Sequence, residues 1–127
     1  MWMAETEKIT INMNVVELGK VDLLVEQGFY SNRTDFIKAS IRSQLATHNQ
    51  VIDQVVNLKS FVMGVSVFSK HDLEKLAASN KKVSIKVIGM LVLTEDIDEK
   101  LAKQTINSIK VFGVFKASPG IKSLFVE

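Results

Sequence analysis

Residues 8–45 read KITINMNVVELGKVDLLVEQGFYSNRTDFIKASIRSQL, and this stretch decides the fold that the sequence predicts. Apolar and polar side chains alternate through residues 8–13, which is typical of a strand with one buried and one exposed face. Asn14 is a suitable N-cap for a following helix, and Gly28 is suited to end that helix because glycine adopts the left-handed conformation without strain. A second capping signal at residues 31–35 opens another amphipathic helix.

One strand and two helices of this size cannot form a stable core alone. The backbone groups of a lone strand have no partner, and about 40 residues is near the lower limit for an independent domain. A second copy of the chain solves both problems, because two strands can pair antiparallel above four interleaved helices. Such a ribbon would present Lys8, Thr10 and Asn12 of both chains on its outer face. A two-stranded ribbon fits the DNA major groove, where these residue types can donate to or accept from base edges.

The same residues resemble the ribbon-helix-helix DNA-binding domain of the CopG, MetJ, Arc and nickel-responsive regulators. The resemblance covers about a third of the chain and is carried by the strand KITINM, the helix ending in Gly28-Phe29 and the run SNRTDFIKASIR. It implies that Lys8, Thr10 and Asn12 contact bases. It also implies that backbone amides at the start of the second helix hold a DNA phosphate, here around Ser31, Asn32 and Arg33. A helix N-terminus favours this second role because it offers free amides and a partial positive charge.

The composition narrows the class of protein. Hydrophobic residues make up 46% of the chain, which is ample for packed cores, and cysteine is absent, which fits a reducing cytoplasm. No apolar run reaches the length of a membrane span, so we expect no membrane association. His48 and His71 are isolated, so the sequence predicts no metal site, no cofactor and no enzyme activity. Residues 1–7 are expected to form a flexible arm.

Charge argues only weakly for DNA binding. Residues 1–50 carry five basic and six acidic side chains, whereas the remainder carries eleven basic and eight acidic ones. Non-specific DNA affinity comes from phosphate neutralisation, so the positive charges of the first part must gather on one face. A dimerisation module that no longer binds DNA is therefore an alternative.

A repeat of 25 and 24 residues organises the second half of the chain. Two sets of landmarks keep this period, glycines and the helix-start residues that follow each of them by five positions: Gly64, Gly89 and Gly113, then Ser69, Thr94 and Ser118. Each unit reads as a strand, a cap and a helix, and units joined through a helix imply parallel strands. The expected strands are nearly continuous in apolar residues, as buried parallel strands are: 61–68, 83–93 and 109–116.

The sequence thus predicts an α+β protein with two domains. Residues 8–50 form an intertwined ribbon-helix-helix dimer, residues 51–58 form a helical linker, and residues 59–127 form a small α/β repeat domain with short parallel strands. The exposed ends of such a short repeat invite self-association, which would strengthen the dimer or join dimers into tetramers. The alternative is a self-contained fold whose only role is stability.

Three functions are compatible with these features. The first is a dimeric, sequence-specific transcriptional regulator, in particular a repressor, that binds double-stranded DNA. The second is an antitoxin with the same DNA-binding half, although toxin-binding tails are commonly disordered until bound and residues 59–127 are regularly patterned. The third is a scaffold or ligand sensor that uses the repeat domain.

Overall fold

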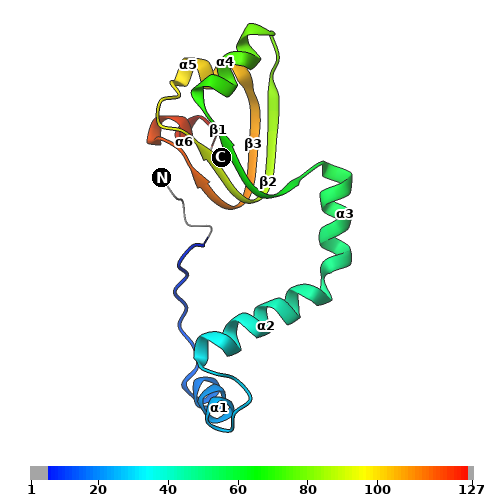
Figure 1. Ribbon diagram of the computed structural model, residues 1–127, viewed down its shortest axis with the longest axis vertical. Coiled ribbons are helices and arrows are strands. Elements are labelled where there is room, and N and C mark those ends of the chain that lie inside the picture. The colour runs from blue at the N-terminus through cyan, green and yellow to red at the C-terminus, as the bar shows by residue number, and fades with distance from the viewer. Residues whose placement is uncertain (1–5, 126–127) are drawn as a thin grey trace. The chain divides into compact units, whose positions relative to one another are not determined.

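The computed structural model describes residues 6–125, and these divide into two compact units (Figure 1). The first unit is Lys8–Val55. The second unit contains residues 56–125 together with residues 6 and 7. Most of the flexible arm expected at residues 1–7 lies outside the described residues.

The first unit is built from helices whose ends follow the predicted signals. Helix α1 (Val15–Glu26) begins after Asn14, whose side chain accepts hydrogen bonds from the amides of the next turn at 2.8 and 3.2 Å. Gly28 follows the end of α1 with a φ of 89°, so the predicted glycine stop is confirmed. Helix α2 (Arg33–Thr47) begins after Asn32.

Residues 6–14 belong to no helix or strand in the single chain. A strand exists only when its backbone pairs with another, and within residues 6–125 no strand pairs with this segment. The strand expected at residues 8–13 therefore stays a prediction that requires a second chain.

The expected linker is helical. The backbone breaks at His48, and helix α3 then runs from Asn49–Lys59 and includes all of residues 51–58. Neither α2 nor α3 contains a buried residue.

The second unit is a three-stranded parallel sheet with helices between the strands (Figure 1). Its strands lie in the order β1-β2-β3, which is also their order in the sequence. Strands and helices alternate along the chain as follows: β1 (Val62–Phe68), α4 (Lys70–Ala78), β2 (Val83–Leu93), α5 (Glu99–Thr105), β3 (Ile106–Lys116) and α6 (Pro119–Phe125). The predicted parallel strands are confirmed, although the third begins at Ile106 rather than at residue 109 because it follows α5 without a loop.

The three glycines that mark the predicted repeat are aligned in the strand register. Gly64 lies opposite Gly89, and Gly89 lies opposite Gly113, so the three glycines form one row across the sheet. Ser69 caps α4, as expected. The expectation that Thr94 begins a helix was wrong.

Helix α5 begins after Asp98, whose side chain accepts a hydrogen bond from the Leu101 amide at 2.7 Å. Thr94 lies four residues earlier, in a turn where its hydroxyl donates to Asp96. The sequence offers several capping side chains here, and the one closest to the helix is used.

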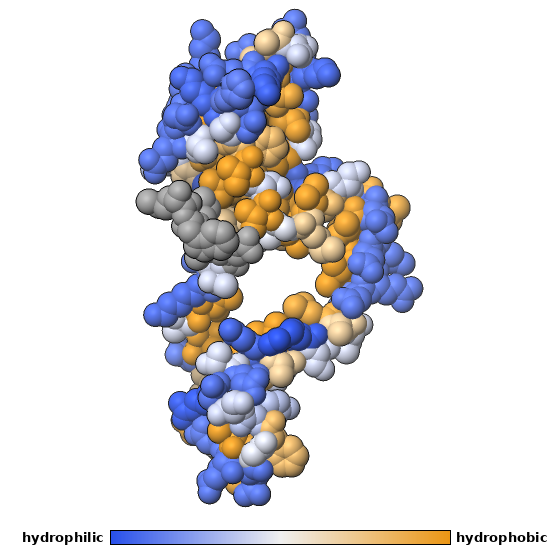
Figure 2. All heavy atoms as spheres, in the orientation of Figure 1, coloured by the Kyte–Doolittle hydropathy of each residue, from blue (hydrophilic) through white to orange (hydrophobic). Residues whose placement is uncertain are grey.

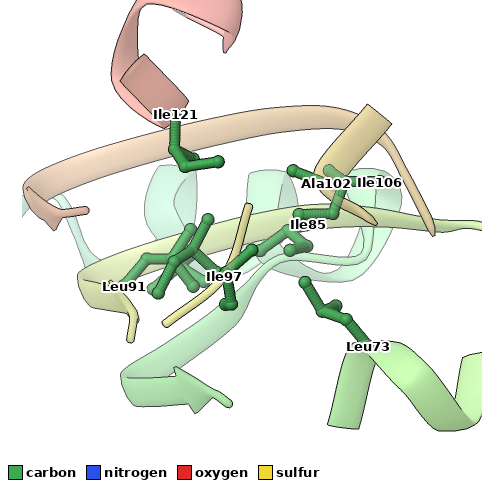
Figure 3. Close-up of a cluster of buried hydrophobic side chains, with 9 residues drawn as sticks. Leu73, Ile85, Leu91, Ile97, Ala102, Ile106 and Ile121 are labelled. Carbon is green, nitrogen blue, oxygen red and sulfur yellow. The ribbon is translucent and has the colours of Figure 1, made fainter. Parts of the chain in front are cut away.

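The core of the second unit lies between one face of the sheet and the three helices. Helix α5 contacts both α4 and α6, so all three lie on the same face. Figure 3 shows Leu73 of α4 and Ile121 of α6 extending toward Ile85 and Leu91 of β2. Each of these four side chains is at most 4% exposed.

The opposite face of the sheet carries no helix of the described chain. Its apolar side chains on the outer strands are about half exposed: Met63, Val65, Val67 and Phe112. Figure 2 shows that apolar residues reach the surface of both units.

Candidate nucleic-acid interface

The three expected base-contacting residues lie in the irregular segment that precedes α1. Lys8, Thr10 and Asn12 are exposed, and their side chains make no hydrogen bond to the described part of the chain. Between them, Ile9 and Ile11 are 80% and 66% exposed. The segment therefore has its polar side chains available for a ligand and its apolar side chains available for burial.

The start of α2 is held by two local hydrogen bonds. Asn32 Oδ1 accepts from the Asp35 amide at 2.7 Å, and Asp35 Oδ2 accepts from the Ser31 amide at 2.9 Å. The Ser31 amide is thus engaged within the chain, whereas the amides of Asn32 and Arg33 donate to no described residue. Two of the three amides assigned to phosphate remain available, and the Asp35 carboxylate beside them opposes an anion.

An edge-to-face aromatic pair joins the loop between α1 and α2 to the first turn of α2. The rings of Tyr30 and Phe36 lie edge to face with centroids 5.0 Å apart. The Phe29 amide also donates to the Leu24 carbonyl at 3.0 Å. These contacts hold the loop that leads into the first turn of α2.

Arg33 makes a two-point contact with Asp22 of α1. Arg33 Nε donates to Asp22 Oδ1 at 2.7 Å, and Arg33 Nη2 donates to Asp22 Oδ2 at 2.8 Å. The guanidinium is therefore already paired in the free chain, and a DNA phosphate would have to compete with Asp22 for it. Sequence reasoning missed Asp22, because two residues eleven positions apart on different helices have no spacing that signals contact.

The Arg33 contact lowers the pKa of Asp22 below its usual value of 3.8, chiefly through the hydrogen bonds and also through the positive charge. A lowered pKa in the folded state means that the pair contributes stability above the pKa of the unfolded chain. That contribution is lost as the pH falls through the folded pKa. Both side chains are about half exposed, so the effect on stability is small.

Replacing Arg33 with glutamine is expected to raise the pKa of Asp22 toward its usual value, because both the hydrogen bonds and the charge are removed. An NMR titration of the Asp22 carboxyl carbon in the folded protein measures this directly. Arg42→Gln is the matched control, since Arg42 contacts the Lys38 carbonyl and not Asp22. Equal Asp22 titration curves in the two variants would contradict the pairing.

The first unit buries very little apolar surface. Val21 is the buried residue of α1, and α2 and α3 have none. Large apolar side chains more than half exposed occur along the whole unit: Ile9, Ile11, Val15, Val16, Leu23, Phe29, Ile41, Leu45 and Val51. A folded helix pair with so small a core needs a further surface against which to pack.

Comparison with known protein families agrees with this arrangement. The model of the ribbon-helix-helix transcriptional regulator family matches residues 4–122. The chain belongs to this family. The match extends well beyond the stretch of residues 8–45 that carries the resemblance in the sequence, and the matched residues include the three strands of the parallel sheet. Neither curated proteins nor solved structures give a match to the chain.

Two further properties concern the described residues alone. In residues 6–125 no helix has the length and apolar character needed to cross a membrane. Within the same range, no three histidine, aspartate or glutamate side chains lie close enough together to hold a metal ion.

Proposed function

We propose that the chain is a homodimeric, sequence-specific DNA-binding regulator, in particular a repressor, that acts in the cytoplasm. Residues 8–13 of two chains pair as an antiparallel ribbon, and the ribbon enters the major groove of double-stranded DNA. The supporting observation is the exposure of that segment beside helices with almost no buried core. A second copy would cover these apolar side chains and supply the missing strand partner.

Lys8, Thr10 and Asn12 contact base edges in this proposal, since they alternate with the apolar residues that the dimer buries. The amides around Ser31, Asn32 and Arg33 hold a phosphate. The Ser31 amide and the Arg33 guanidinium have partners in the free chain, so the amides of Asn32 and Arg33 carry most of this contact.

Thr10→Ala, Asn12→Ala and Lys8→Ala are each expected to weaken specific binding by about 1–3 kcal/mol, the usual value of a good base contact. The mass of the protein in solution should not change, because these side chains face away from the dimer core. The measurement is retention of genomic fragments by the purified full chain at two salt concentrations, followed by titration of the selected site. Lys20→Ala, a lysine exposed on α1, is the matched control.

The outcomes separate the candidate functions. Selective retention of a short site with repeated half-sites supports the regulator, whereas equal retention of all fragments would indicate an architectural binder. A stable dimer that retains no DNA would show that the ribbon serves only as a scaffold. That alternative is favoured by the slightly acidic balance of residues 1–50. Unchanged affinity in all three alanine variants would refute the assigned contact face.

The antitoxin alternative is less well supported by the second unit. Toxin-binding tails are commonly disordered before binding, whereas residues 62–125 form a regular sheet with helices packed on one face. For this unit we propose self-association through its exposed sheet face or sheet edges. The mass in solution separates a dimer from a tetramer.

A further inference from the structure

A hollow of 590 Å³ lies at the carboxyl end of the parallel sheet in the second unit. Residues that end or directly follow all three strands line it: Ser69 after β1, residues 92–96 of β2 and its following loop, and residues 116 and 117 at the end of β3. The volume is within the usual range of about 300–1,000 Å³ for small-molecule sites.

Backbone hydrogen bonds and a buried side chain hold the loop after β2, which forms one wall of the hollow. The Thr94 amide donates to the Phe68 carbonyl at 3.1 Å, which ties the loop to the end of β1. The Ile97 amide donates to the Thr94 carbonyl at 3.3 Å, and the Ile97 side chain is 4% exposed in the core. Glu95 and Asp96 are therefore displayed from a fixed turn, which lowers the entropy lost when a ligand binds.

The charges that line the hollow are balanced. Lys116 and Lys122 face it from β3 and α6, and Glu95 and Asp96 face it from the loop. Among the described residues, neither Lys116 nor Lys122 has its amino group within 4.0 Å of an acidic oxygen. The ion pair found in residues 6–125 joins Arg33 to Asp22 in the first unit. The opposite charges thus line one cavity without forming an ion pair with each other.

This balance selects the chemistry of a ligand. A simple anion would be attracted by the lysines and repelled by the carboxylates. A simple cation would be attracted by the carboxylates and repelled by the lysines. A small molecule with one carboxylate and one ammonium group can satisfy both sides at once. Apolar side chains also line the hollow, and Val92 and Ala117 can contact an aliphatic portion.

We propose that this hollow binds a free α-amino acid, with its carboxylate toward Lys116 and Lys122 and its ammonium group toward Glu95. The Asp96 carboxylate already accepts from the Thr94 hydroxyl, so Glu95 is the main partner for the ammonium group. The site is independent of the proposed DNA contact, because all its residues belong to the second unit.

Calorimetric titration of the full chain with each of the common L-amino acids tests this. At least one is expected to bind with one site per chain. Lys116→Gln and Glu95→Gln should each weaken its binding about tenfold, since each removes one charge-assisted contact. Lys100→Gln and Glu74→Gln are matched controls, because both are exposed and lie outside the hollow.

Acetate and methylammonium, which each carry one of the two charged groups, should bind far more weakly than the amino acid. Failure of every amino acid to bind at millimolar concentration would overturn the proposal. Binding that is unchanged in both hollow variants would overturn it as well, because the ligand would then lie elsewhere. Neither result depends on whether the protein binds DNA.

Discussion

Gly89→Ala is expected to destabilise the second unit by more than about 3 kcal/mol. Gly89 has a φ of 137°, a conformation in which a residue with a side chain is strained by about 1–3 kcal/mol. A Cβ atom at this position would also overlap the carbonyl oxygen of Gly64 on the neighbouring strand. The obstacle is backbone, so the overlap is relieved only by separating β1 from β2, which breaks the hydrogen bonds between them.

Gly64→Ala is the matched control for this prediction. Gly64 has a similar φ of 130°, but a Cβ there would meet no atom within 4 Å. Its replacement should therefore cost only the strain of the backbone, and Gly89→Ala should cost clearly more. Urea denaturation of the full chain, monitored by circular dichroism, gives the free energy of unfolding of each variant for comparison. Equal losses would show that steric overlap between the strands contributes nothing.

The row of glycines explains why the second unit could be predicted in outline from the sequence. A Cβ atom at Gly89 or Gly113 would overlap the backbone of the preceding strand. All three glycines, Gly64 included, also have a positive φ that favours glycine, so glycine recurs once in every repeat. The spacing of Gly64, Gly89 and Gly113 therefore reports the sheet register directly. The prediction that Thr94 begins a helix failed because a threonine that closes a turn cannot be distinguished in the sequence from one that caps a helix.

The candidate interface was predictable to a smaller extent. Local signals placed both helices correctly, because Asn14 and Asn32 act on amides only two or three residues away. The contact of Asp22 with Arg33 could not be predicted, because it depends on how two helices cross. The strand predicted at residues 8–13 could not be tested in a single chain, because it forms only by pairing with a second chain.

Ile11→Glu is expected to prevent formation of the ribbon. Ile11 is 66% exposed in the single chain, and in the proposed dimer it points into the core beneath the ribbon. Both copies of a dimer would bury the new carboxylate without a partner, which costs several kcal/mol and weakens association by about a hundredfold or more. Specific DNA binding should be lost with the ribbon, because both strands are needed to fill the groove.

Thr10→Glu, the same substitution one residue earlier, separates dimerisation from DNA contact. Neighbouring residues of a strand point to opposite faces, so a glutamate at position 10 stays in solvent on the outer face and leaves the dimer intact. It should still abolish DNA binding, because it brings negative charge toward the bases. Hydrogen exchange of the amides in residues 8–13 reports the pairing itself, even if the second units hold the chains together. Protection in Thr10→Glu and its loss in Ile11→Glu are expected, whereas protection in both would refute the ribbon.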